Sequence, residues 1–256
     1  MHAVQIEQIR CLTDNYCVIL HAPETGETAA IDAPDAKAIQ TALDAHGWRL
    51  TDIFVTHHHA DHTGGIMPLK GYYACRVTGP DAEAERIPGL DRAVTEGTPL
   101  QFAGHAIHVL ATPGHTLGHV SYHVPSLNVA FTGDTLFALG CGRLFEGDSA
   151  LMWASLQKIR ALPDDTAIYC GHEYTLANGR FALSVEPEND ALKTRMIAIE
   201  AKRAAGLPTL PTSISLERAT NPFLRPNSSA IRARLGLGSA PDAHVFARLR
   251  ELKNKA

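Results

Sequence analysis

The sequence has no long apolar run and no excess of basic residues. None of its apolar segments approaches the ~18–20 residues that a membrane-spanning helix needs, so we expect no membrane partner. Its 27 acidic residues outnumber the 23 basic ones, and the net charge of −4 argues against a nucleic-acid partner. Residues 1–16 include Glu7, Arg10 and Asp14 where a secretory signal would have an apolar core. We therefore expect a cytoplasmic protein.

Cysteine is scarce and scattered. The five cysteines are an odd number and include no Cys-x-x-Cys pair. This pattern is typical of reduced thiols, and it favours neither a disulfide framework nor a thiolate metal site. The 256 residues allow one large domain, or one medium domain with an attachment.

The N-terminal two thirds of the chain mixes short apolar runs with helical patterns. The run Thr28–Asp32, the helical pattern Ala36–His46 and the run Asp52–Thr56 follow one another, which predicts a strand–helix–strand unit. A further helix is predicted at Ser149–Leu162. The other predicted strands are Cys17–His21, Ala106–Ala111, His119–Val124, Asn128–Thr132 and Thr166–Cys170.

The pattern changes after Tyr174. Glu188–Ala205 has apolar residues at helical spacing, and Val245–Leu252 predicts another short helix. We therefore predict two domains, an α/β domain over residues 1–173 and a mainly helical domain over residues 174–256.

Potential metal ligands are concentrated in one short segment, residues 56–62, with the sequence THHHADH. His57, His59 and Asp61 recur at a period of two, which places side chains on one side of an extended backbone. His62 follows directly and diverges from Asp61 if a helix starts there. One ion cannot easily bind all four side chains, whereas two ions ~3.5–4 Å apart could share them. The intervening His58 points the opposite way, and we expect it to pack or to support the site.

Three later ligand-type residues, His115, Asp134 and His172, each follow a glycine at the end of a predicted apolar strand. Glycine lets the backbone turn tightly and brings the next side chain to the mouth of the sheet. Loops at such positions often carry catalytic residues. His119 is close enough along the chain to support a ligand. Together with the first segment, these residues predict a dinuclear metallohydrolase.

This pattern resembles the metallo-β-lactamase superfamily, whose motif T-H-x-H-x-D-H is followed by a later His, Asp and His. Four segments are also similar to the hydroxyacylglutathione hydrolase (glyoxalase II) family: Asp14-Asn15-Tyr16, Cys141-Gly142-Arg143, Gly171-His172-Glu173-Tyr174 and Asn221-Pro222-Phe223-Leu224-Arg225. The first resemblance covers residues ~12–175, and the second spans nearly the whole chain. It implies an α/β fold, an αββα sandwich with a C-terminal, mainly helical domain that covers the site.

The resemblance also implies how two divalent metal ions would be bound. The first ion would be bound by the imidazoles of His57, His59 and His115. The second would be bound by Asp61, His62 and His172, with Asp134 bridging both ions. We assign catalytic roles to the carboxylates of Asp134 and Asp61. Nitrogen and oxygen donors without thiolate suit zinc, our first expectation, and also iron or manganese.

For the substrate, the resemblance implies S-D-lactoylglutathione, hydrolysed to glutathione and D-lactate in the second step of methylglyoxal detoxification. Its implied glutathione contacts are Arg143, Phe145, Tyr174 and Arg225, since guanidinium groups bind carboxylates bidentately. Many family members have Lys and Tyr at the first two positions, so here the charge is retained and a hydroxyl is lost. We expect a metal-bridging hydroxide to attack the thioester carbonyl, and the thiolate to leave without a strong general acid. We also expect a monomer.

Other functions fit the superfamily motif. The main alternative is a mononuclear-iron dioxygenase acting on glutathione persulfide, which needs one metal ion. A nucleic-acid-processing enzyme is disfavoured by the acidic net charge, and a β-lactamase by the helical C-terminal region. A binding module with a vestigial site is disfavoured by the complete ligand set.

Overall fold

The computed structural model describes residues 2–256 and divides into two compact units. Unit 1 comprises Met1–Ala111 and Gly118–Gly133, and unit 2 comprises Thr112–Leu117 and Asp134–Ala256. None of the helices in the described part of the chain combines the length and the apolar character that crossing a bilayer requires.

Unit 1 contains a six-stranded mixed sheet in the order β1-β2-β3-β4-β5-β6. Its strands are β1 (Gln5–Cys11), β2 (Asn15–His21), β3 (Thr28–Ile31), β4 (Asp52–Phe54), β5 (Arg76–Pro80) and β6 (Arg92–Val94). Strands β1 to β3 pair antiparallel, and β3 to β6 pair parallel. The parallel pairing of β3 and β4 around helix α1 (Ala36–His46) confirms the predicted strand–helix–strand unit.

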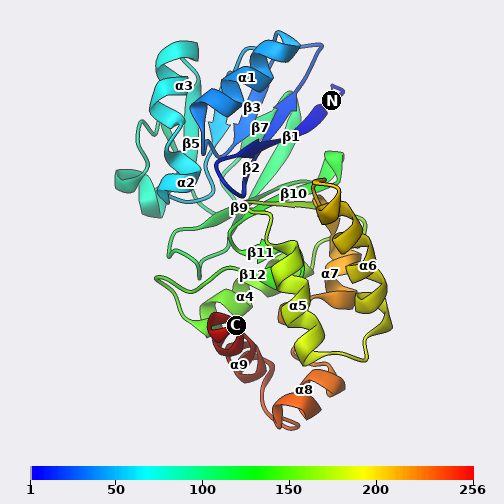
Figure 1. Cartoon of the computed structure of the whole chain (residues 1–256). Helices are drawn as coiled ribbons and strands as arrows, with labels where there is room; N and C mark the ends of the chain where they lie inside the picture. The colour runs from blue at the N-terminus through cyan, green and yellow to red at the C-terminus, as the bar shows by residue number, and fades with distance from the viewer. Residues whose placement is uncertain (1) are drawn as a thin grey trace. The chain divides into compact units, whose positions relative to one another are not determined.

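Helices α1 and α3 (Ile66–Tyr73) cover one face of this sheet (Figure 1). Apolar side chains of both helices form one buried core with alternate strand residues such as Ile19 and Ile53. Helix α1 begins where the Asp35 carboxylate accepts hydrogen bonds from two backbone amides, and it ends at Gly47 in the left-handed conformation (φ 68°). Helix α1 is therefore fixed by capping as well as by burial.

The opposite face of the sheet packs on a second set of strands in unit 1. These are β7 (Leu100–Phe102), β8 (His105–Ala111), β9 (Val120–Val124) and β10 (Val129–Gly133), adjacent in the order β10-β9-β8-β7 and antiparallel. The rings of Phe54 and Tyr122 lie 5.8 Å apart, and the Tyr122 hydroxyl donates to the Val55 carbonyl over 2.7 Å. The chain leaving β4 is thereby held against the second set of strands.

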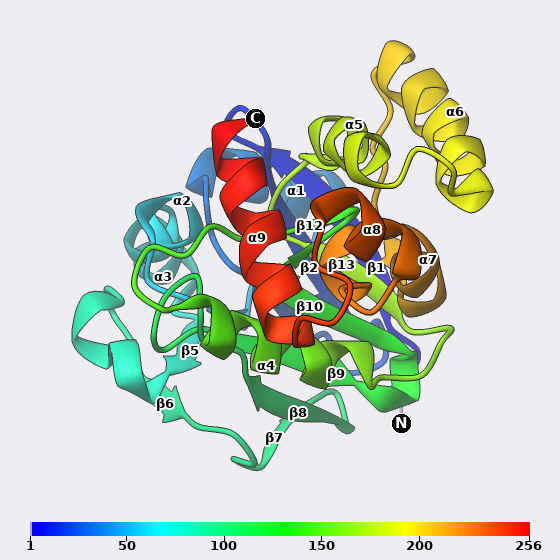
Figure 2. The ribbon, with the colours of Figure 1, turned by 90° about the horizontal axis from the view of Figure 1, so that it is seen from below.

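Unit 2 is mainly helical. Its strands form two short antiparallel pairs, β11 (Leu136–Phe137) with β12 (Gly140–Cys141), and β13 (Ala167–Cys170) with β14 (Thr212–Ser213). Its helices are α4 (Ser149–Arg160), α5 (Thr175–Val185), α6 (Asp190–Ala204), α7 (Ile214–Thr220), α8 (Ser229–Leu235) and α9 (Asp242–Lys255). Helix α9 packs against α4, where Trp153 and Phe246 stack with ring centroids 5.9 Å apart (Figure 2).

The remaining elements are short. They are α2 (Ala60–Thr63) and the 3-10 helices Asp81–Arg86, Pro125–Leu127 and Pro222–Leu224. Every strand and helix range predicted from the sequence overlaps an observed element of the same type, with ends that agree to within three residues.

Candidate metal centre

The His-rich segment of unit 1 follows strand β4 and runs into the short helix α2. Residues 57–59 are irregular, and α2 begins at Ala60, so Asp61 and His62 both lie in its first turn. The expected period-two arrangement is therefore wrong for Asp61, because the backbone is already helical there. The ligand atoms of His57 and His59, of His57 and His62, and of Asp61 and His62 still lie within 4.8 Å of one another. The ligand atoms of Asp61 and His62 are therefore brought together by a helical turn and not by an extended backbone.

Asp32, at the end of β3, orients this segment, and sequence analysis missed it. Its carboxylate is buried and accepts hydrogen bonds from the Thr56 amide (2.7 Å), the Thr56 hydroxyl (2.8 Å) and His62 Nδ1 (2.8 Å). Asp32 has φ 57°, a conformation that Asp tolerates better than most residues. The available signal was an acidic residue that directly ends a predicted apolar strand.

These hydrogen bonds fix which ring nitrogens face the site. His62 Nδ1 must carry the proton, because a carboxylate accepts, so His62 Nε2 presents a lone pair. The Thr56 hydroxyl donates to Asp32, so it accepts from His57 Nδ1 over 3.0 Å, and His57 Nε2 presents a lone pair too. Partners of this kind orient histidine ligands and raise their basicity.

Two further side chains hold the segment from outside. Asn15 Nδ2, at the start of β2, donates to the backbone carbonyl (3.0 Å) and to Oδ2 (3.1 Å) of Asp61. The buried Glu83 accepts from the amide and Nδ1 of His58 over 2.7 and 2.8 Å, and from the Gly118 amide over 3.0 Å. His58 thus faces Glu83, as its opposite orientation predicted.

His119 is fully buried and lies against His57, with ring centroids 4.9 Å apart and planes 29° apart. At Gly133 (φ 46°), an added Cβ would lie 2.6 Å from both His119 Nε2 and Thr56 Oγ1. Only glycine fits there, since the end of β10 passes directly over the His-rich segment.

Unit 2 carries the other three predicted ligands. His115 Nε2 and His172 Nε2 each lie 3.4 Å from Asp134 Oδ2, and all three residues are buried. His115 Nδ1 donates to the Arg143 carbonyl over 2.9 Å, which directs its Nε2 lone pair toward the carboxylate. Unit 2 therefore places one carboxylate oxygen between two imidazoles. A nearby glycine is needed as well: at Gly142, an added Cβ would lie 1.9 Å from the Asp134 carbonyl oxygen.

The donor set fits divalent metal ions. His57 Nε2 and His59 Nδ1 lie 3.1 Å apart. Two nitrogens on one ion at ~2.0–2.1 Å would be separated by roughly 2.9–3.4 Å, so this spacing matches shared coordination. Five imidazoles and two carboxylates without thiolate suit zinc, iron or manganese. The residues present therefore support divalent metal binding.

The predicted substrate residues all lie in unit 2. Phe145 (62 % exposed) packs edge-on against His115, with ring centroids 5.2 Å apart. Tyr174 (37 % exposed) stacks on His172 at 4.7 Å with an interplanar angle of 3°. Arg143 is exposed, whereas the guanidinium of Arg225 pairs with Glu186. Three of the four residues thus lie beside unit-2 ligands, and Arg225 has another partner.

Helix α9 adds two basic residues that sequence analysis missed. Arg250 is buried and donates to the Cys141 carbonyl over 2.7 Å. Cys141 lies close to Arg143 in the chain. Burial lowers the pKa of Lys253, and the nearby charges of Arg250 and Arg143 lower it further. These three cations form a basic cluster suited to carboxylates. No motif marked it, because the helix pattern alone does not show which face its basic residues occupy.

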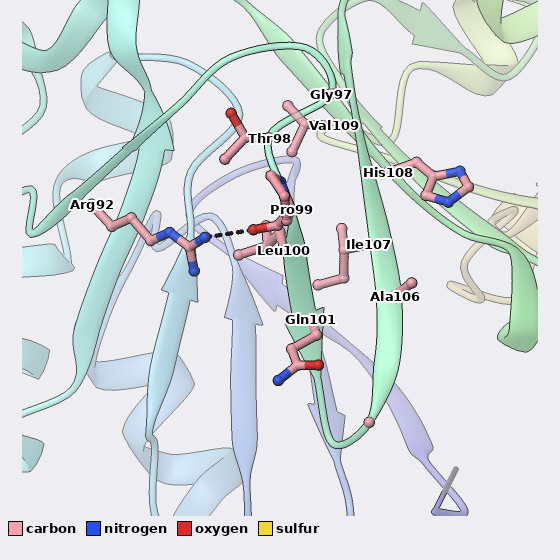
Figure 3. A pocket seen from close by; sticks show the side chains of 11 residues that line it. Arg92, Gly97, Thr98, Pro99, Leu100, Gln101, Ala106, Ile107, His108 and Val109 are labelled. Carbon is pink, nitrogen blue, oxygen red and sulfur yellow. Dashed lines mark hydrogen bonds between the residues drawn. The ribbon is translucent and has the colours of Figure 1, made fainter.

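A surface hollow of about 640 Å³ lies elsewhere in unit 1, beside strands β7 and β8 (Figure 3). Its wall includes the exposed His108, and Arg92 donates to the Pro99 carbonyl at its rim. No carboxylate is among the described residues that line it. The described lining therefore offers a single imidazole with no acidic partner.

Comparison with known proteins identifies both parts of the chain. Residues 28–172 match the family model of the metallo-beta-lactamase superfamily, and residues 173–256 match that of the hydroxyacylglutathione hydrolase C-terminus. The hydroxyacylglutathione hydrolases of Brucella anthropi and Brucella ovis are each 55% identical over 251 residues. The matches cover 98% of this chain, and 96% and 98% of those two proteins, respectively.

Solved structures share the fold. ETHE1 from Myxococcus xanthus has a TM-score of 0.70 and 24% identity, covering 96% of this chain and 90% of its own. The BLEG-1 B3 metallo-beta-lactamase has a TM-score of 0.67 and 25% identity, covering 86% of this chain and 100% of its own. The prediction of an α/β metallo-β-lactamase sandwich with a helical C-terminal domain is confirmed.

Proposed function

Because the chain belongs to the hydroxyacylglutathione hydrolase family of the metallo-β-lactamase superfamily, we propose that it hydrolyses S-D-lactoylglutathione to glutathione and D-lactate. The observation that carries this conclusion is the extent of the similarity. It covers nearly the whole chain, including the helical C-terminal region that a general superfamily member would not need. The enzyme is a thioester hydrolase, and the reaction belongs to methylglyoxal detoxification.

We propose that the seven predicted ligands bind two metal ions, and that zinc is the first choice for both. His57, His59 and His115 would bind one ion and Asp61, His62 and His172 the other, with Asp134 shared. Bound ions of this kind lower the pKa of water and polarise a carbonyl, which is the chemistry that thioester hydrolysis needs. The hydrogen bonds that fix the ring nitrogens of His57, His62 and His115 support this assignment.

The chain's own residues then orient the substrate. Arg143 and the neighbouring Arg250 and Lys253 supply positive charge for the two glutathione carboxylates. Tyr174, stacked on His172, offers a hydroxyl and a flat face beside a proposed ligand. Phe145 can offer only an apolar contact. The thiolate product needs no strong general acid, since its pKa is ~8.5–9.

The cytoplasmic location, the domain boundary between residues 173 and 174, and the monomeric state stay predictions, as do the roles of the site residues and the number and identity of the metal ions. The location is supported by five cysteines that are all free and buried. The dioxygenase alternative is not favoured, because the relatives that are 55% identical bear the hydrolase name, whereas ETHE1 at 24% identity supports the fold alone.

The direct test is thiol release from S-D-lactoylglutathione by the purified protein. We expect hydrolysis without oxygen uptake, and negligible oxygen uptake with glutathione persulfide. Oxygen uptake with the persulfide and no thiol release from the thioester would contradict the hydrolase and favour the dioxygenase.

A further inference from the structure

The turn of the β11–β12 hairpin is held by side chains of the helical region. Leu139 lies in the turn with φ 59°, a conformation that is uncommon for a leucine. The Asn221 amide group donates to the carbonyls of Phe137 (3.2 Å) and Gly140 (3.0 Å), which flank Leu139. One side chain beyond helix α7 therefore ties down both sides of the turn.

Glu217 in helix α7 completes this support. Its Oε2 accepts from the Leu139 amide over 2.8 Å and from Asn221 Nδ2 over 2.9 Å, and its Oε1 accepts from Arg195 and Thr212. Glu217 and Asn221 are both fully buried. A buried carboxylate with four donors forms a satisfied network with little freedom to move.

The orientation of the Asn221 amide is unambiguous. Its Oδ1 accepts from the Phe223 amide over 3.0 Å, while every group around its Nδ2 is an acceptor. Asn178 in helix α5 also binds the turn, because it donates to the Ala138 carbonyl over 3.1 Å. Figure 1 shows α5 beside the hairpin. Several backbone groups of one turn thus depend on the carboxamide and carboxylate groups of distant helices.

The hairpin carries Phe137 against two site residues. Its ring meets His172 edge-on at 5.9 Å and Tyr174 edge-on at 5.4 Å, while those two rings stack on each other. His172 in turn faces Asp134. Phe137, at the edge of the turn, is therefore in contact with both of these rings.

We propose that Asn221 and Glu217 are positioning residues of this enzyme. They fix the β11–β12 turn so that Phe137 holds His172 and Tyr174 in their working orientation. The inference rests on the proposed function for the role of His172. The sequence resemblance linked the segment Asn221–Arg225 to glutathione through Arg225. Under this proposal the segment acts mainly by supporting the hairpin whose Phe137 contacts the proposed metal ligand His172.

The experiment compares Asn221→Ala with a matched control, Asn189→Ala. Asn189 is an asparagine of the helical region as well, although it is only partly buried. Like Asn221, it donates to a backbone carbonyl, that of Ala219 (3.0 Å), and its side chain caps a helix. Its hydrogen bonds join α6 to α7 and to Glu186, away from the hairpin. We expect both variants to lose thermal stability, with faster amide hydrogen exchange at Leu139 only in Asn221→Ala.

Metal retention and turnover give the decisive readouts. We expect Asn221→Ala to lose metal to a chelator about tenfold faster than the wild type, and its kcat to fall about tenfold. This is the lower end of the effect of removing a group bonded directly to a metal ligand, because Asn221 acts on His172 only through Phe137. Asn189→Ala should match the wild type in both. Equal effects in the two variants, or faster exchange at Leu139 with wild-type metal retention and kcat, would overturn the proposal.

A double-mutant cycle tests the route through Phe137. If Asn221 acts through this ring, Phe137→Ala combined with Asn221→Ala should lower kcat and metal retention little more than Phe137→Ala alone. Independent, multiplicative effects would contradict it. If the wild type proves inactive on the thioester, the proposed function fails, whereas metal retention and hydrogen exchange still decide the inference.

Discussion

Arg225 donates two hydrogen bonds to the Glu186 carboxylate, from Nη2 to Oε1 over 2.7 Å and from Nε to Oε2 over 3.2 Å. The Glu186 side chain is almost fully buried, and the Arg225 side chain is only a quarter exposed. Ser228 also donates to the same carboxylate over 2.7 Å. The pair therefore joins the loop after helix α7 to the end of helix α5.

This pairing makes a specific prediction for Arg225. We expect Arg225→Gln to lower the free energy of unfolding by about 1–3 kcal/mol, because it leaves a buried carboxylate without two of its hydrogen-bond donors. Since the guanidinium is already engaged, KM for S-D-lactoylglutathione should rise less than it does in Arg143→Gln. Urea unfolding and steady-state kinetics of both variants check this. A larger KM increase in Arg225→Gln would restore its role as a glutathione contact.

The same pair predicts a pH dependence. Burial alone would raise the pKa of Glu186, but hydrogen bonds from Arg225, Asn189 and Ser228 outweigh it and hold the pKa below 4.5. A depressed carboxyl pKa adds stability that is present above ~4.5 and is lost as the pH falls below it. The stability difference between the wild type and Glu186→Gln should therefore be largest at pH 7 and shrink below pH 4.5. A difference that is constant from pH 7 to pH 4 would contradict this.

Asp32 should control metal affinity without binding metal itself. In Asp32→Asn, the single carboxamide oxygen cannot replace both carboxylate oxygens, of which Oδ1 accepts from the Thr56 amide and Oδ2 accepts from the Thr56 hydroxyl and His62 Nδ1. The ring nitrogens of His57 and His62 should therefore lose their fixed orientation. We expect metal affinity to fall about 10–100-fold, as is typical for such partners. Competition with a chromogenic chelator measures it, and an unchanged affinity would remove Asp32 from this role.

Two glycines should respond to alanine in opposite ways. Gly142→Ala would push the Asp134 backbone aside, since its Cβ would lie 1.9 Å from that carbonyl oxygen. We expect a loss of about 1–3 kcal/mol or more from overpacking, with a large fall in kcat. Gly71 lies inside helix α3 with open space around it, so Gly71→Ala should stabilise the protein by about 0.5–1 kcal/mol. Thermal unfolding of both variants checks the signs, and a well-tolerated Gly142→Ala would show that the backbone can relax there.

The sequence was most informative where periodicity and local chemistry agree. The unit from β3 through α1 to β4 was predicted because its caps, Asp35 and Gly47, and its apolar stripe point to the same element. The seven candidate ligands could be named because they follow strand ends, three of them directly after a glycine. Asp61 was misplaced because a period of two holds only while the backbone stays extended.

Contacts between distant residues could not be predicted in this way. The sequence alone does not show that Asp32 forms a hydrogen bond with His62, Asn221 with Phe137, or Arg225 with Glu186. Each pair joins elements whose adjacency depends on the complete fold. Arg250 and Lys253 were missed for a similar reason, since the importance of a basic helix face depends on what it packs against.

We propose that two metal ions used for thioester hydrolysis are bound by the seven side chains His57, His59, Asp61, His62, His115, Asp134 and His172. The most direct measurement is metal content and thiol release on one sample each of the wild type, Asp134→Ala and the control His108→Gln, which removes an exposed imidazole of β8. We predict two ions per chain and full activity for the wild type and the control, with activity abolished and metal lost in Asp134→Ala. Wild-type turnover by a metal-replete Asp134→Ala protein would contradict the account.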